Sequence, residues 1–174
     1  MERVLNVLVV HPWRDLEGYI DVRTAEALYE FELAEKFLEQ GVYRNAAGKA
    51  FQGWKALLAA LAGLNRELLT GEFKGVARLR ERLVVERTDF VIAVMPTSTM
   101  KKVANILAQK YGDEIVYLTE LALSLHEFQY NGIDPSGALS RYIDLKDVEA
   151  DVERLVKKGR EVLCSVFKKC SHSG

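Results

Sequence analysis

The residues best suited to chemistry lie in one short stretch, LHEFQYNGIDP, at positions 125–135. On a helix, His126 and Tyr130 are four residues apart and therefore share a face. An imidazole and a phenol that converge beside a polar loop could bind an anion or transfer a proton. The alternative is that both rings pack inward and their polar atoms hold the loop that carries Asn131 and Asp134. A buried His126 would favour this alternative, whereas a solvent-exposed His126 beside an arginine would favour anion binding or proton transfer.

Metal-binding and cofactor-binding patterns are incomplete or absent. The stretch begins like the zinc motif H-E-x-x-H, but Tyr130 stands where the second histidine should be. Cys164, Cys170 and His172 match no common zinc template, and on one helix the two cysteines would point about 120° apart. We therefore expect no pairing of these cysteines, no metal and an unliganded tail. Glycine-rich phosphate loops and the G-x-S-x-G nucleophile motif are absent, so no cofactor is expected.

The bulk composition is typical of a globular chain of 174 residues, and we expect one domain over 1–174, with 1–12 as an N-terminal extension and 169–174 as a tail. With a net charge of -1, the chain has no overall electrostatic attraction to nucleic acid or membranes. No apolar run is long enough to span a bilayer, and the first residues lack a signal-peptide cleavage site, so a cytoplasmic protein is expected. A charged fraction of 28% with few amides favours a thermophilic source.

Hydrophobic periodicity predicts five or more helices. The helical patterns cover 19–39, 42–62, 64–87, 99–111, 114–130 and 144–168. The short link at Gly41 predicts that the first two helices pack antiparallel. Gly71 and Gly75 interrupt the third pattern, and NGIDPSG at 131–137 predicts a loop.

These elements favour an all-α, up-and-down helical bundle. The rival is an α/β fold in which 4–10 and 90–95, both rich in β-branched residues, form parallel strands. That fold would leave most of the helices without a sheet to cover.

Two blocks of the sequence resemble the archaeal PaREP family. They are LAEKFLEQGVYRNAAGKAFQGWKALLAALA at 33–62 and LHEFQYNGIDPSGALSRY at 125–142. The resemblance implies membership of the HEPN superfamily, an all-α bundle of HEPN type, and a homodimer. HEPN relatives include ribonuclease toxins, partners of minimal nucleotidyltransferases, and proteins with no known activity.

The ribonuclease members of that superfamily use an arginine followed by a histidine after four to six residues. In this sequence the nearest arginine before His126 is Arg87, and Arg3 and His11 are separated by seven residues. The catalytic pattern is therefore missing, no catalytic residue is assigned, and the resemblance favours a binding protein over an enzyme.

The polar residues of the two blocks are the candidate ligand-binding residues. They are Arg44, Lys49, Lys55, His126, Tyr130, Asn131, Asp134, Arg141 and Tyr142. If the two blocks meet across the bundle, they would form a cationic, hydrogen-bonding cleft suited to a nucleotide phosphate.

Three functional hypotheses follow. The first is a homodimeric binding module for a nucleotide, RNA or a partner protein. The second is a divergent ribonuclease in which His126 works with Arg141 or Arg44, distant in sequence but close in space. The third is a toxin–antitoxin component that acts with a nucleotidyltransferase.

Overall fold

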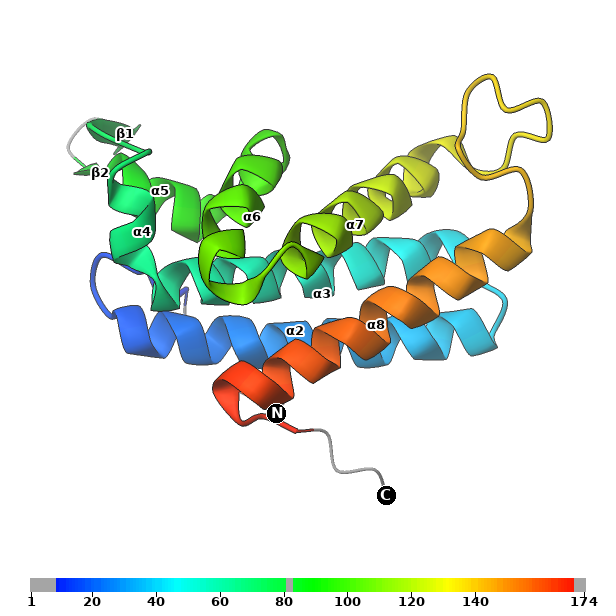
Figure 1. The fold of residues 1–174 in the computed structure, drawn as a ribbon, viewed down its shortest axis with the longest axis horizontal. Helices are drawn as coiled ribbons and strands as arrows, with labels where there is room; N and C mark the ends of the chain where they lie inside the picture. Colours follow the sequence, from blue (N-terminus) through cyan, green and yellow to red (C-terminus); the bar gives the residue numbers. More distant parts are fainter. Residues whose placement is uncertain (1–8, 81–82, 171–174) are drawn as a thin grey trace.

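A computed structural model describes residues 9–80 and 83–170, except for the side chain of Arg80. Within these ranges the chain forms seven helices and one antiparallel hairpin, so the predicted all-α bundle is confirmed (Figure 1). No helix in these ranges has both the length and the apolar character needed to cross a membrane. The elements are α2 (Leu16–Glu39), α3 (Tyr43–Leu64), α4 (Arg66–Thr70), β1 (Val76–Arg80), β2 (Leu83–Glu86), α5 (Arg87–Val94), α6 (Thr97–Tyr111), α7 (Glu114–Asn131) and α8 (Leu145–Phe167).

Helices α2 and α3 form the predicted antiparallel hairpin. The turn between them uses Gly41 at a φ of +69°, a left-handed conformation that glycine adopts without steric cost. Lys49 and Glu30 pair across the hairpin at 2.9 Å, and Ile20 near the start of α2 lies against Gly63 near the end of α3.

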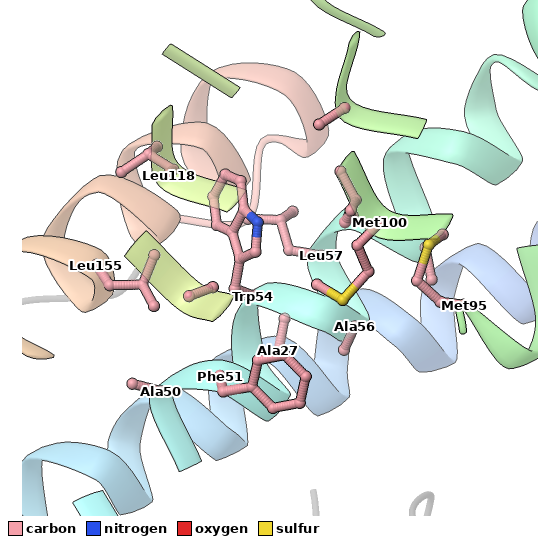
Figure 2. Packing of buried hydrophobic residues seen from close by; sticks show 14 of the residues in the cluster. Ala27, Ala50, Phe51, Trp54, Ala56, Leu57, Met95, Met100, Leu118 and Leu155 are labelled. Atoms are coloured by element: carbon pink, nitrogen blue, oxygen red, sulfur yellow. The ribbon is translucent and has the colours of Figure 1, made fainter. Parts of the chain in front are cut away.

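Helix α3 occupies the centre of the molecule. It contacts α2, α5, α6, α7 and α8, and its alanines and glycines allow these neighbours to approach closely. Trp54, Phe51, Leu57 and Leu58 lie in this interior and are almost completely buried. Figure 2 shows the Trp54 side chain among buried residues that come from several helices.

The region 64–95 differs from the sequence prediction. The helical pattern predicted over 64–87 ends at Thr70, and strands β1 and β2 of the same region pair with each other at one end of the bundle (Figure 1). Gly75 has a φ of +88°, which excludes a continuous helix through this position, and the β-branched residues Val76, Val84 and Val85 suit strands. The possible strand at 90–95 lies mostly in helix α5, so the α/β alternative is wrong.

The expectation that Cys164 and Cys170 cannot pair is also wrong. The two residues form a disulfide with their Cα atoms 4.3 Å apart. The prediction assumed one continuous helix, whereas α8 ends at Phe167 and Lys168 takes a left-handed φ of 57°. The chain therefore turns back and brings Cys170 to Cys164. His172 and residues 4–8 lie outside the described residues, and Val9 and Val10 belong to neither a helix nor a strand.

Candidate anion-binding site

The exposed side of α3 carries basic and amide side chains and no carboxylate. At 100° per residue, the polar residues of this side fall within about 140° of one another around the helix. We call them the α3 strip: Arg44, Asn45, Lys49, Gln52 and Lys55. Helix α3 contains no Asp or Glu at all, so any negative charge near the strip comes from neighbouring helices.

Helix α7 runs antiparallel to α3 and brings its second half to the strip. The His126 ring stacks on the ring of Phe51, with centroids 4.1 Å apart. At the end of α7, the Arg44 guanidinium lies over Gly132, where an added Cβ would be 2.5 Å from Nη2. The structure therefore brings the two sequence blocks together across α3 and α7.

His126 is partly buried. Its Nδ1 atom is enclosed and has no hydrogen-bond partner among the described residues, and Tyr130 packs against its ring edge-on at 5.3 Å. Burial and the nearby Lys55 ammonium lower the pKa of His126, against a smaller opposing effect of Glu127. The neutral imidazole is therefore favoured at neutral pH. The charges acting on His126 come from a lysine and a glutamate rather than from an arginine.

Two of the candidate cations are already paired. Lys49 is bound to Glu30 of α2, as described above. Arg141 donates to the Ser124 hydroxyl at 3.3 Å and lies 3.4 Å from a Glu127 carboxylate oxygen. The exposed pair of Arg141 with Glu127 is weak and the pair of Lys49 with Glu30 is partly buried, but both reduce the charge available to a ligand.

Arg44 and Lys55 differ from these two cations. Within the described part of the chain, neither has a carboxylate oxygen within 4.0 Å. Lys55 is half-buried, and burial and the neighbouring Arg23 lower its pKa. A half-buried ammonium without a counterion is a natural binding partner for an anion.

Two of the loop candidates hold the loop that joins α7 to α8. The Asp134 carboxylate accepts hydrogen bonds from the Ser136 hydroxyl at 2.6 Å and from the Leu139 N–H at 2.6 Å, and these bonds lower the pKa of Asp134. The Asn131 amide donates to the Leu139 carbonyl at 3.2 Å. These contacts match the alternative interpretation, in which the polar residues stabilise the loop.

Tyr142 anchors the same loop to the bundle. Its side chain is buried, packs edge-on against Phe128, and donates its hydroxyl to Asp151 at 2.8 Å. Burial and this carboxylate raise the pKa of Tyr142. Asn131, Asp134 and Tyr142 are therefore engaged within the protein, whereas Tyr130 is 67% exposed beside His126.

Sequence reasoning missed Arg23 of α2, which lies close enough to Lys55 to lower its pKa. Arg23 falls outside both sequence blocks, and a single arginine on an amphipathic helix carries no local signal. Only the packing of α2 against α3 places it beside the strip.

The electrostatic effect of Lys55 on His126 can be tested by titration. Lys55→Gln removes the positive charge that disfavours protonation of the imidazole, so the pKa of His126 should rise toward its ordinary value. The measurement is an NMR titration of the histidine ring protons in both proteins. Lys157→Gln, an exposed charge change on α8, should leave the His126 titration unchanged. Identical His126 curves for wild type and Lys55→Gln would contradict this electrostatic effect.

The lowered pKa of His126 also fixes the sign of its effect on stability. In the unfolded chain a histidine takes up a proton at a pKa of about 6.5, whereas folded His126 takes it up only at a lower pH. The contribution of His126 to the free energy of unfolding is therefore complete above a pH of about 6.5 and is lost as the pH falls toward the folded pKa.

The family model of the archaeal PaREP1/PaREP8 family matches residues 22–156. This range includes α3, α7 and the loop that follows α7. Comparisons with curated proteins and with solved structures give no match. Because the family model covers well over half of the chain, the protein belongs to the archaeal PaREP1/PaREP8 family.

Proposed function

We propose that this PaREP-family protein is a binding protein for single-stranded RNA, which it contacts through the α3 strip and the adjoining rings of α7. The observation that carries the proposal is that two cations of the strip, Arg44 and Lys55, have no carboxylate partner among the described residues and lie on the strip that His126 adjoins. RNA presents a phosphate for each base, so a surface with both cations and exposed rings fits its repeating chemistry.

The two cations lie on one side of α3, eleven positions apart in the sequence, which is about three helical turns. At a rise of about 1.5 Å per residue, this separation is about 16 Å, so the two cations can contact different phosphates of one strand. Between them lie Gln52 and Asn45, whose amides can donate to phosphate or to base edges. Tyr130, which is mostly exposed, provides a face for a stacked base.

The family resemblance supports two finer parts of the proposal, a bundle of HEPN type and a homodimer. The loop between α7 and α8 presents Leu139 and Ile143 at 80% and 54% exposure, and exposed apolar side chains of this kind favour a protein contact. A minimal nucleotidyltransferase is the alternative occupant of that surface. Light scattering coupled to size-exclusion chromatography measures the mass in solution and so distinguishes a homodimer from a monomer that binds a different protein.

The binding test uses a fluorescein-labelled single-stranded oligoribonucleotide and fluorescence anisotropy over a series of salt concentrations. The double variant Arg44→Gln/Lys55→Gln should bind more weakly than wild type. Its plot of log Kd against log salt should be shallower by about 1.4, because each phosphate contact on a single strand contributes about 0.7.

The matched control is Lys146→Gln/Lys157→Gln, which removes two exposed lysines from α8. It changes the net charge equally and should retain the wild-type salt slope. Equal losses in both double variants, or no binding by wild type at low salt, would refute the proposal. A denaturing gel of the same mixtures reports cleavage, and cleavage abolished by His126→Ala would favour the divergent ribonuclease instead.

A further inference from the structure

A small polar pocket lies at the Lys55 end of the α3 strip. It has a volume of about 90 Å³ and is bounded by α2, α3 and the C-terminal end of α5. Its polar side chains are Arg23 and Glu26 from α2 and Gln52 and Lys55 from α3.

We propose that this pocket binds one phosphate group, the phosphomonoester at the end of an RNA strand or of a free mononucleotide. The inference rests on the proposed RNA-binding function and assigns the terminal phosphate of the RNA to this pocket. It also predicts a preference for strands with a terminal phosphate, which a uniformly basic surface would not show.

The size of the pocket limits the group that can enter it. Its volume of about 90 Å³ is small beside the sites of about 300–1,000 Å³ that enclose drug-sized ligands. A single phosphate group is the part of a nucleotide that such a pocket can enclose, so the sugar and the base would lie outside it.

Arg23 is held rigidly in the pocket wall. Its Nε donates to the Tyr19 hydroxyl at 3.1 Å, and its two terminal nitrogens donate to Glu26 at 2.5 Å and to the Ala93 carbonyl at 3.0 Å. These bonds use three of the five guanidinium N–H groups and leave two for a ligand. Because the side chain is already ordered, a ligand would bind without the entropic cost of fixing it.

The charge balance of the pocket favours an anion. Glu26 is neutralised by Arg23, so the Lys55 ammonium remains as one uncompensated positive charge. No hydrogen bond from Lys55 to another described residue occupies its three donors. The Gln52 amide adds a neutral donor from the next turn of α3.

The C-terminal end of α5 would repel an anion if its carbonyls were free. Three of its last four carbonyls are instead engaged by donors. The Tyr19 hydroxyl donates to the Ile92 carbonyl at 2.6 Å, Arg23 donates to that of Ala93, and the Met95 N–H donates to that of Val91 at 2.8 Å. These bonds offset the partial negative charge of the helix end, so the Lys55 ammonium dominates the pocket.

The test compares two oligoribonucleotides of the same sequence, one with a 5′-phosphate or 3′-phosphate and one with hydroxyl ends. Wild type should bind the phosphorylated strand about tenfold more tightly, as expected for charge-assisted hydrogen bonds to one group. Lys55→Gln and Gln52→Leu should each reduce this ratio toward one. Arg44→Gln should weaken both strands and preserve the ratio, because Arg44 lies at the other end of the strip. Circular dichroism verifies that each variant is folded.

Competition with adenosine and adenosine monophosphate separates the two sources of the phosphate. Displacement by the monophosphate alone supports the pocket and shows that a free mononucleotide also enters it. Equal binding of the two strands by wild type would overturn the pocket while leaving the RNA-binding proposal intact. Binding of the monophosphate without either strand would support the pocket and refute the RNA-binding proposal.

Discussion

Replacing Trp54 with alanine should lower the free energy of unfolding by about 4 kcal/mol, the middle of the range for removing a fully buried large aromatic. Trp54 has no exposed surface, and it lies on α3, which contacts α2, α5, α6, α7 and α8. In Figure 2 its ring is drawn close to Leu57 and Leu118, which come from different helices. Alanine would therefore leave a cavity between α3 and α7 that rigid helices cannot close. Urea unfolding followed by far-UV circular dichroism gives the value.

The indole also makes a polar contact, which a second variant isolates. Its Nε1 donates to the Thr119 hydroxyl at 3.0 Å, and that hydroxyl donates to the Ile115 carbonyl at 2.8 Å. Trp54→Phe loses the first bond and part of the volume, so its cost should be well below that of alanine. Tyr117→Ala is the control, because Tyr117 is an aromatic of α7 that is 68% exposed, and its loss should stay within about 0.5 kcal/mol. A similar cost for Trp54→Ala and Tyr117→Ala would show that Trp54 does not organise the core.

Replacing Gly159 with alanine should destabilise the protein by about 2 kcal/mol, although alanine is the better helix former. Phe31 of α2 has no exposed surface and lies between two glycines, Gly53 of α3 and Gly159 of α8. A Cβ at Gly159 would be 2.5 Å from Phe31 Cε2, and a Cβ at Gly53 would be 2.6 Å from Cδ1. Overpacking of this kind costs about 3 kcal/mol at the upper end, and the helix propensity of alanine returns about 1 kcal/mol.

A matched glycine distinguishes this clash from a general effect of the substitution. Gly71 has a φ of -65°, and no atom of the described residues lies within 4 Å of an added Cβ, so Gly71→Ala should be neutral or slightly stabilising. In the background of Phe31→Leu, Gly159→Ala should cost less than in wild type, because the two positions share one space. Thermal and urea unfolding of the four proteins measure this coupling. A stabilising Gly159→Ala would mean that α8 moves away from α2 without cost.

The sequence predicted the parts of the site that depend on local spacing. His126 and Tyr130 are four positions apart, and on a helix this places the two rings together, as the structure shows. The basic residues of 42–62 fall on one side of a helix whose other sides are apolar, so their exposure follows from periodicity. The choice between binding residues and loop-holding residues could not be made from the sequence, because Asp134 and Tyr142 have types suited to both roles.

By itself, the sequence determined the all-α class, the α2–α3 hairpin at Gly41 and the loop after α7, because periodicity and glycine conformation act over a few residues. The tertiary structure decided the contacts between distant segments. It placed Arg23 beside Lys55, enclosed Phe31 between Gly53 and Gly159, and turned the chain at Lys168 so that Cys170 reaches Cys164. It also decided that 76–80 and 83–86 form paired strands, since short β-branched segments fit a strand or a helix equally well until they pack. Such contacts depend on how helices dock, and docking is set by the shapes of many side chains together rather than by the spacing within any one segment.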